Sequence, residues 1–286
     1  MGLLANKVAV ITGSSRGFGL AMAKAFAGEG ASVVLASRSN AAVQKAADEI
    51  RSAFPGVQVT GIACDTSDMA QVKALAEHAL ETSGRFDVWV NNAGISPAYG
   101  PTVHIQPEEF VKTTQTNVLG TYYGSVVAMR HFLPRHAGKL INIAGAGARG
   151  PVPMQSAYAA SKAWIRNFTL ALAKEYPDSG VGIHVLNPGM MMTDMLTHVA
   201  VVAGFEHKLD ALPRVLRVLG KPPEVPARKA VWLASSATDG RTGLEVSVFN
   251  PLAAMFGFMR EGIRGVAGRP DDWPRPNITS VPPAIP

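Results

Sequence analysis

Short apolar runs that alternate with longer helical patterns constrain the fold of this chain more than any other feature. The runs of strand length are Val8–Ile11, Val33–Ala36, Val57–Ala63, Val88–Val90, Leu140–Ile143, Ile183–Leu186 and Glu245–Phe249. The helical patterns between them cover Leu20–Gly30, Ala41–Ala53, Asp68–Ser83, Glu108–Leu133 and Tyr158–Tyr176. Strands that are apolar on both faces and alternate with helices predict a parallel sheet covered on both sides. We therefore expect a single doubly wound, Rossmann-type α/β domain with ligand groups at the carboxyl ends of its strands.

Composition narrows the class of protein further. The single cysteine among the 286 residues, Cys64, excludes an internal disulfide and a cysteine-based metal cluster, which indicates a reducing compartment. The net charge of +6 suits an anionic ligand, but the basic residues are scattered, so nucleic acid is not an expected partner. No run of 18 apolar residues and no signal peptide is present, so we expect a cytoplasmic protein without a transmembrane segment.

A glycine-rich turn follows the first predicted strand and opens the first predicted helix. It reads Thr12-Gly13-Ser14-Ser15-Arg16-Gly17-Phe18-Gly19. Glycines at such a place allow a tight turn and let the helix N-terminus approach a pyrophosphate, whose charge the helix dipole favours. This context predicts a dinucleotide site.

The spacing of this turn resembles that of the classical short-chain dehydrogenase/reductase family, and four further segments agree with that family. They are Asn91-Asn92-Ala93-Gly94, Asn117, Tyr158-Ala159-Ala160-Ser161-Lys162 and Pro188-Gly189-Met190-Met191-Met192-Thr193. The resemblance covers about residues 5–250 in the family's order. It implies cofactor contacts from Gly13, Ser15, Arg16, Gly17, Phe18, Gly19, Asn92, Ala93, Gly94, Tyr158, Lys162, Pro188, Gly189 and Thr193. By the same resemblance, Thr193 would bond the nicotinamide carboxamide.

The residues after the second strand bear on which dinucleotide is bound. Enzymes of this architecture that use NAD usually place a carboxylate there, but this chain has Ser37-Arg38-Ser39. Arg38 and Arg16 together could neutralise a 2′-phosphate, so NADP(H) is the predicted cofactor, although either arginine alone could be a solvated residue. Asp65 resembles the family's adenine-contacting aspartate, and the capping of a turn explains it nearly as well.

The chemistry is predicted at Tyr158 and Lys162, which lie four residues apart on one helix face. A free tyrosine has a pKa near 10, and a nearby ammonium is expected to lower that pKa. By resemblance, Tyr158 would protonate a carbonyl oxygen, Lys162 would hold the nicotinamide ribose, and Asn117 would order a water near the lysine.

One position departs from the family. The catalytic serine expected thirteen residues before Tyr158 is Gly145 here, and Ala144 beside it offers no hydroxyl either. Loss of that donor would cost roughly 2.7–4 kcal/mol of transition-state stabilisation if nothing replaced it. A water, Ser156 or another donor could fill the role, activity could be lost, or Gly145 could make room for a bulky substrate.

Secondary signals resemble the chlorophyll b reductase branch of the family. They are Ala144-Gly145-Ala146-Gly147, the phrase Gly182-Ile183-His184-Val185-Leu186-Asn187-Pro188-Gly189-Met190, and a long C-terminal extension. Members of that branch reduce a formyl group on a chlorin ring. The resemblance implies a formyl-bearing chlorin as one candidate substrate.

Residues 190–225 are expected to form the substrate lid by family analogy. Thr193 could cap a helix carrying Met195, Leu196, Val199 and Val202, and Met191 and Met195, with Gly145, are the candidate substrate contacts. Ordinary core packing explains the methionines equally well. His198 and His207 lack metal-ligand spacing, so no metal site is predicted.

The C-terminal extension, residues 251–286, contains a second apolar helix. Leu252, Met255, Phe256, Met259, Ile263 and Val266 recur at helical spacing, with Arg260 and Arg264 elsewhere on the helix. This face could pack on its own subunit or on a partner, or lie in a membrane interface as a peripheral contact. The residues Phe249-Asn250-Pro251 replace the family's usual ending, so its standard C-terminal contacts are in doubt.

Residues 1–250 are thus predicted to form the NADP(H)-binding catalytic domain, with 251–286 as an extension of it. The function predicted is NADPH-dependent reduction of a bulky, apolar aldehyde or ketone, by a homodimer or homotetramer. Two alternatives remain open: a non-catalytic NADP(H)-binding sensor or assembly protein, for which Gly145 argues, and a membrane-surface scaffold.

Overall fold

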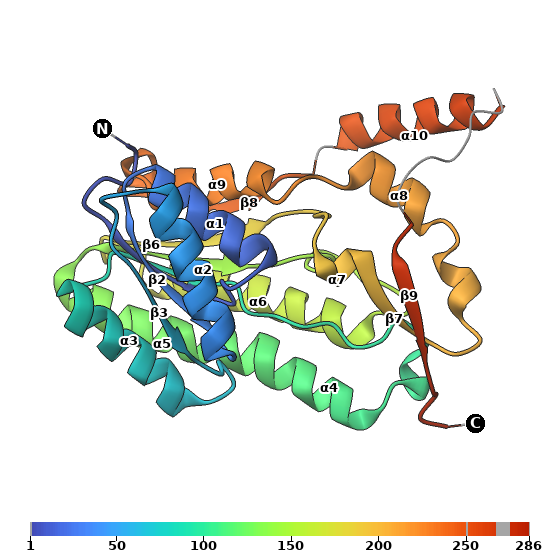
Figure 1. Ribbon diagram of the computed structural model, residues 1–286, viewed down its shortest axis with the longest axis horizontal. Helices are drawn as coiled ribbons and strands as arrows, with labels where there is room; N and C mark the ends of the chain where they lie inside the picture. Colours follow the sequence, from blue (N-terminus) through green and yellow to red (C-terminus); the bar gives the residue numbers. More distant parts are fainter. Residues whose placement is uncertain (1, 250, 267–274, 286) are drawn as a thin grey trace.

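Seven parallel strands form the centre of the computed structural model, which describes residues 2–249, 251–266 and 275–285 (Figure 1). Their order across the sheet is β3-β2-β1-β4-β5-β6-β8. They are β1 (Val8–Thr12), β2 (Ser32–Ser37), β3 (Val59–Ala63), β4 (Val88–Asn91), β5 (Gly138–Ile143), β6 (Val181–Asn187) and β8 (Glu245–Ser247). Because the order reverses between β1 and β4, a crevice for ligands is expected outside the carboxyl ends of these two strands. The predicted doubly wound fold is confirmed.

The inner strands of the sheet, β1, β2, β4, β5 and β6, bury side chains on both faces. In β1, Ala9 and Ile11 belong to one apolar core, and Val8 and Val10 belong to the other. The first core is covered by α1 (Gly17–Gly28), α2 (Asn40–Ala53) and α9 (Glu224–Ala234). The second is covered by α3 (Met69–Ser83), α5 (Gly120–Phe132) and α6 (Ser156–Glu175). This double coverage explains why the strand-length runs are continuously apolar.

The helix ends follow local signals in the sequence. Asp68 is the N-cap of α3, and its carboxylate accepts the backbone N–H of Ala70 at 2.8 Å. Gly30 follows α1 with φ +86°, in the left-handed region that ends many helices. α1 begins at Gly17, earlier than the predicted start at Leu20, so the last glycines of the turn belong to its first turn.

The long helical pattern over 108–133 contains one irregular turn. α4 (Pro107–Thr114) continues through a π-helical turn at Gln115–Leu119 into α5. Asn117 lies in this turn and is fully buried. Gly124 does not interrupt α5. Its lack of a side chain leaves room for the amide oxygen of Asn91, with which a Cβ at this position would clash.

The segment after β6 differs from the prediction. The predicted helix ends early, because α7 spans only Asp194–Thr197 and the strand β7 (His198–Val202) follows it. Val199 and Val202 are therefore strand residues. Apolar residues three apart suit a helix, but the β-branched Val199, Val201 and Val202 also suit a strand, and here a partner strand is present.

That partner strand is β9 (Asn277–Val281), which lies within the Pro-rich tail and pairs with β7 in parallel (Figure 1). β7 is held on its other side by Tyr99, whose backbone N–H donates to the carbonyl of Ala200 at 2.8 Å. Part of the expected lid, residues 198–202, is thus a short strand held between two segments that are far away in the sequence.

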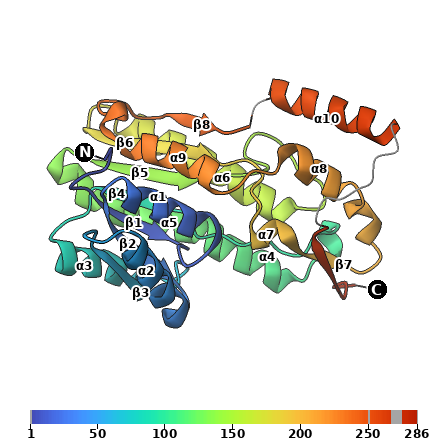
Figure 2. The ribbon, with the colours of Figure 1, turned by 45° about the horizontal axis from the view of Figure 1, so that its top comes forward.

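Two helices lie beyond the sheet, α8 (Leu212–Leu219) and α10 (Pro251–Val266), and α10 rests on α8 (Figure 2). Short 3₁₀ turns occur at Thr102–His104, Leu133–Arg135, Glu206–Leu209 and Ser236–Thr238. Among the described residues, no helix has the length and apolarity needed to cross a membrane.

Candidate active site

The glycine turn leaves the N-terminus of α1 open to an anion. Gly13 and Gly17 have φ of +62° and +55°, values that only glycine adopts without strain. A Cβ on Gly19 would clash with the carbonyl of Gly13, so the helix presses directly on the turn. The first turn of α1 has no side-chain cap and no acidic residue. Free N–H groups at the positive end of a helix fit the pyrophosphate of a dinucleotide.

The other residues of the turn differ in what they expose. The side chain of Phe18 is buried in the core beneath α1, so only its backbone could meet a cofactor. Ser15 is partly exposed, and Arg16 is exposed. The structure therefore brings the predicted turn residues together, with backbone rather than side chains at its centre.

Thr12 and Asn92 join the turn to the end of β4. The Thr12 hydroxyl accepts the backbone N–H groups of Asn92 at 3.0 Å and Ala93 at 3.1 Å. The Asn92 amide donates in return to the carbonyls of Thr12 at 2.9 Å and Gly13 at 3.1 Å. Asn92, Ala93 and Gly94 are thus held beside the glycine turn, as the motif implies. The role of Thr12 was missed, because a threonine ending a strand carries no distinctive signal.

No carboxylate stands at the end of β2. Arg38 directly follows the strand and is exposed, and Ser39 caps α2 by accepting the N–H of Ala42 at 3.3 Å. Asp65, after β3, accepts the backbone N–H of Ser67 at 3.0 Å and its hydroxyl at 2.7 Å. These contacts are those of a capped turn, the second of the two explanations left open for Asp65.

Arg16 reaches the lid in this structure. Its guanidinium lies 3.5 Å from the carboxylate of Asp194, and both side chains are largely exposed, at 77% and 64%. An exposed ion pair of this kind is worth roughly 0–1 kcal/mol, so it leaves Arg16 available to a phosphate.

Tyr158 and Gly145 face each other across the end of β5. A Cβ built on Gly145 would lie 2.8 Å from the Tyr158 hydroxyl oxygen and 3.5 Å from Cε of Lys162. The Tyr158 hydroxyl therefore occupies the space that a side chain at position 145 would take. The ammonium of Lys162 lies 5.4 Å from the centre of the Tyr158 ring and donates to the carbonyl of Ile143 at 3.1 Å.

Burial governs the acidity of this pair. Desolvation raises the pKa of Tyr158 to about 12 and lowers the pKa of Lys162 to about 8. The prediction from the sequence was a lowered pKa for Tyr158, the opposite direction. It rested on the charge of the nearby ammonium and left out the loss of water around the phenol. In this structure desolvation outweighs the charge. The phenol is therefore protonated at neutral pH, the state of a proton donor.

Asn117 joins the π-helical turn to α6 through hydrogen bonds. Its amide nitrogen donates to the carbonyl of Ile95 at 2.9 Å and to the hydroxyl of Ser161 at 3.0 Å, and its oxygen accepts the N–H of Ile95 at 2.8 Å. A Cβ on Gly94 would lie 3.3 Å from the Asn117 oxygen and 3.6 Å from the Lys162 ammonium. Gly94 thus lies between these two polar groups, so the structure brings Asn117 and Lys162 to one place.

The Pro-Gly segment after β6 leads to residues that border the glycine turn. Gly189 has φ +73°, and Pro188 before it is buried. Thr193 stands opposite Gly17, with its methyl carbon 3.6 Å from where a Cβ on Gly17 would be. It precedes α7, but its side chain makes no capping hydrogen bond.

The two candidate substrate methionines lie in different surroundings. Met191 packs against the core beneath α1 and α9, and Met195 is 43% exposed. Packing therefore accounts for Met191, whereas Met195 remains accessible to a ligand.

Ser156, one candidate to replace the missing serine, is engaged with Thr102. Its hydroxyl accepts that of Thr102 at 2.8 Å, at the N-terminus of α6. It lines a cavity of about 300 Å³ together with Pro97, Ala98, Thr102, Val103, Ile105, Pro107, Phe110, Met154, Gln155 and Ala157. This apolar cavity adjoins the first turn of the helix that carries Tyr158.

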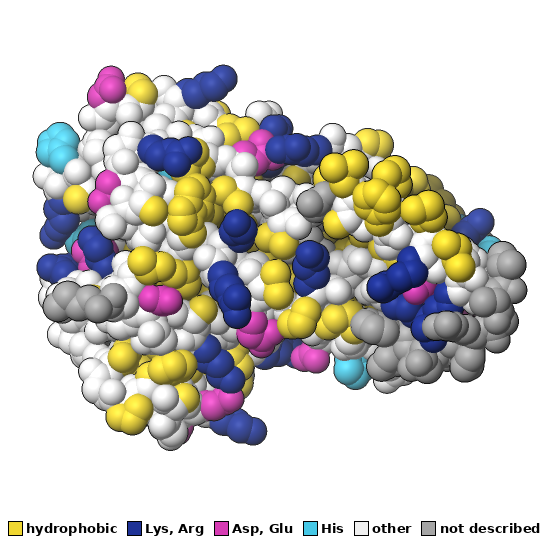
Figure 3. All heavy atoms as spheres, turned by 90° about the horizontal axis from the view of Figure 1, so that it is seen from above, with side chains coloured by type: hydrophobic (Ala, Val, Ile, Leu, Met, Phe, Trp, Pro, Cys, Tyr) yellow, Lys and Arg dark blue, Asp and Glu magenta, His cyan; other side chains and the backbone are white. Residues whose placement is uncertain are grey.

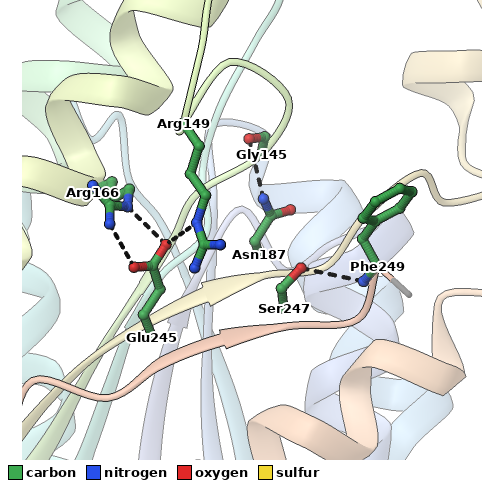
Figure 4. Close-up of polar contacts among 7 residues, drawn as sticks. All are labelled: Gly145, Arg149, Arg166, Asn187, Glu245, Ser247 and Phe249. Carbon is green, nitrogen blue, oxygen red and sulfur yellow. Dashed lines mark hydrogen bonds and ion pairs between the residues drawn. The ribbon is translucent and has the colours of Figure 1, made fainter. Parts of the chain in front are cut away.

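A carboxylate on β8 fixes the loop that carries Gly145 (Figure 4). Glu245 accepts Nε of Arg149 at 2.8 Å and both Nε and Nη2 of Arg166 at 2.7 and 2.8 Å. These guanidinium groups lower the pKa of Glu245 to about 2. Asn187 donates to the carbonyl of Gly145 at 3.4 Å. The cluster was missed in the sequence, because Glu245, Arg149 and Arg166 come from separate elements.

Three features together define an oxidoreductase. They are the Rossmann-type sheet, the glycine turn at its first crossover, and the tyrosine–lysine pair at the carboxyl ends of its strands. The model of the short chain dehydrogenase family matches residues 7–201. The chain belongs to the short-chain dehydrogenase family.

Several relatives are similar over different shares of the chain. Chlorophyll(ide) b reductase NOL of Oryza sativa subsp. japonica is 37% identical over 194 residues, 65% of this chain and 56% of that protein. The probable chlorophyll(ide) b reductase NYC1 of the same plant is 33% identical over 65% of this chain, which spans only 40% of that protein. 3beta-hydroxysteroid dehydrogenase 1 of Eggerthella lenta is 34% identical over 89% of this chain and 97% of its own length.

Solved structures agree with the fold. The 3-ketoacyl-(acyl-carrier-protein) reductase of Brucella melitensis, complexed with NADH, has a TM-score of 0.75 at 33% identity and covers 86% of this chain and 97% of its own. A single-residue variant of actinorhodin polyketide ketoreductase with NADPH has a TM-score of 0.77 at 28% identity, with the same two coverages. Neighbours of this fold therefore bind either dinucleotide.

Proposed function

We propose that this chain is an NADPH-dependent carbonyl reductase acting on a bulky, apolar aldehyde or ketone. The observation that carries the proposal is the placement of the Tyr158 hydroxyl next to Gly145 and Lys162, at the carboxyl end of β5, where burial raises its pKa to about 12. A phenol in that place can deliver a proton to a carbonyl oxygen, and the glycine beneath it adds no bulk.

The preference for NADPH is supported by the end of β2. Arg38 is exposed there, Arg16 stands in the glycine turn, and no acid occupies Ser37-Arg38-Ser39. A carboxylate would repel a 2′-phosphate, whereas a guanidinium forms paired, charge-assisted hydrogen bonds with it. The glycine turn and the open N-terminus of α1 would hold the pyrophosphate.

The residues of the site divide the reaction between them. When bound, the reduced nicotinamide supplies a hydride equivalent to the carbonyl carbon. Tyr158 donates its hydroxyl proton to the carbonyl oxygen, so an alcohol forms and the tyrosine is left as a phenolate. The Lys162 ammonium, 5.4 Å from the ring centre, stabilises that negative charge, and solvent returns the proton.

A bulky substrate is supported by Met195, which is 43% exposed. Gly145 does not add room for it, because the Tyr158 hydroxyl fills the space beside that glycine. The relatives named chlorophyll(ide) b reductase make a formyl-bearing chlorin one candidate substrate. The relative named 3beta-hydroxysteroid dehydrogenase 1 makes a steroid ketone another. Both are rigid, largely apolar ring systems, so they share the chemistry that the site suits.

The test is oxidation of NADPH with a panel of aldehydes and ketones that includes a formyl-bearing chlorin and a steroid ketone. We expect Tyr158→Phe to lower turnover by about 10²–10⁴-fold, the usual contribution of a general acid, with NADPH affinity nearly unchanged. Equal turnover by the variant and the wild-type protein would show that Tyr158 is not the proton donor.

A non-catalytic NADP(H)-binding sensor is the second candidate, and Gly145 in place of the family's serine favours it. Tight NADPH binding without turnover of any carbonyl in the panel would favour the sensor over the reductase. Turnover that depends on Tyr158 would exclude it.

A further inference from the structure

The helix α10 uses one face to pack on α8. Its residue Gly257 is closely apposed to α8, since a Cβ there would lie 2.6 Å from a methyl of Val218. Ala254 and Glu261 on the same face are buried, and the Glu261 carboxylate lies 3.5 Å from the guanidinium of Arg217. This face is therefore already occupied within the subunit.

The opposite face of α10 is apolar and exposed, and we refer to it as the α10 stripe. It consists of Leu252, Met255, Phe256, Met259 and Ile263, which are 65%, 55%, 57%, 55% and 66% exposed. Figure 3 shows hydrophobic side chains gathered over this helix. Packing within the subunit, one of the explanations considered for these residues, therefore covers less than half of each of the five side chains. Exposed apolar area of this extent indicates a binding surface.

The charges around the α10 stripe distinguish between two candidate partners, a second copy of the chain and a lipid bilayer. The only acidic residue of α10 is Glu261, which is buried against α8 and paired. Arg260 is exposed and adjoins the stripe. If two stripes packed against each other, α10 would offer no free carboxylate to Arg260. Anionic lipid headgroups would pair with this arginine, and acyl chains would accept the stripe.

We propose that the α10 stripe docks on an anionic lipid bilayer, with the helix lying in the plane of the interface. At about 1.5 Å per residue, the 16 residues of α10 extend about 24 Å, less than the hydrocarbon core of a bilayer. The amphipathic arrangement, with a packed face opposite an apolar face, places the protein body on the aqueous side.

The docked helix is connected to the segment that follows β6. α8 lies beneath α10, and Lys221, just after α8, exchanges backbone hydrogen bonds of 3.0 Å with Met190 and Met192. The lid residues next to the cofactor turn are therefore joined to the docked helix through α8.

The experiment is flotation of the full chain with phosphatidylcholine vesicles, with and without phosphatidylglycerol, in the absence of any substrate. We expect binding to the anionic vesicles and at least a tenfold loss of binding for the double variant Phe256→Ser/Met259→Ser. Arg260→Glu is expected to weaken binding to the anionic vesicles alone. The matched control is Leu80→Ser/Val111→Ser, which removes exposed apolar side chains from α3 and α4 and should bind like the wild-type protein.

Three results would overturn the proposal. The wild-type protein could fail to float with either vesicle, or the stripe variant could float as well as the control. The stripe variant could also change the oligomeric state measured by light scattering while the wild-type protein ignores lipid, which would assign the stripe to a second copy. Thermal unfolding and NADPH binding of each variant verify folding. Because no substrate is used, failure here leaves the reductase proposal untouched.

Discussion

Substituting Gly145 by alanine tests the arrangement at the centre of the candidate site. The added Cβ would lie 2.8 Å from the Tyr158 hydroxyl oxygen, whereas tight contacts of a Cβ begin at 3.0 Å and ordinary ones at 3.4 Å. The hydroxyl must therefore withdraw by about 0.2–0.6 Å. A misplacement of 1 Å costs on the order of 10²-fold in rate, so this shift predicts a loss of turnover of about 3- to 15-fold.

The assay is steady-state oxidation of NADPH with the best carbonyl of the panel, at saturating cofactor. NADPH affinity should change little, because the shift occurs at the hydroxyl and not at the glycine turn. Gly145→Ser is the matched variant, since it adds the same Cβ together with a hydroxyl donor. If the wild-type site lacks that donor, the serine variant should turn over faster than the alanine variant.

Turnover of Gly145→Ala within twofold of the wild-type value would refute the reasoning. It would mean that the Tyr158 hydroxyl does not occupy the space above Gly145 during the reaction. Equal rates for the alanine and serine variants would mean that another group already supplies the donor.

Two further changes test the cofactor preference and the acid stability. Arg38→Ala should weaken NADPH binding by about 10- to 100-fold, because charge-assisted hydrogen bonds to the 2′-phosphate are lost, and should leave NADH binding unchanged. An equal loss of affinity for both cofactors in a fluorescence titration would refute the role of Arg38 in binding the 2′-phosphate. Burial, assisted by Lys139 and Arg241, lowers the pKa of His184 to about 3 from its ordinary 6.5. Between these two pH values, His184 binds a proton in the unfolded chain but not in the folded chain. The free energy of unfolding should therefore fall as the pH drops from 6.5 towards 3. The fall attributable to His184 is about 2 kcal/mol by pH 5, and His184→Leu should remove it from urea-unfolding curves at pH 7 and pH 5. An unchanged pH dependence in that variant would assign the acid sensitivity to other groups.

Much of the fold could be predicted because its signals are local. The strands are short apolar runs, and Asp68 and Gly30 mark helix ends through their own hydrogen bonds and backbone conformation. The glycine turn was predictable for the same reason, since its function depends on residues close together in the chain.

The rest depends on contacts between distant parts of the chain. β7 could not be distinguished from a helix, because its partner β9 lies in another part of the sequence. The direction of the Tyr158 pKa shift could not be predicted either, because desolvation depends on what surrounds the phenol in three dimensions. Glu245 joins Arg149 and Arg166 from separate elements, so no spacing in the sequence reveals the cluster.

The pairing of β7 with β9 has a consequence for the order in which the protein is made. The glycine turn and α6 are complete once residues 1–175 have been synthesised. β7, at 198–202, acquires its parallel neighbour only when residues 277–281 have left the ribosome. Until then, β7 has an unpaired edge. The segment after β6 is thus completed late in translation, and a chain released before Asn277 would have Tyr158 and Lys162 in place without the β7–β9 pair.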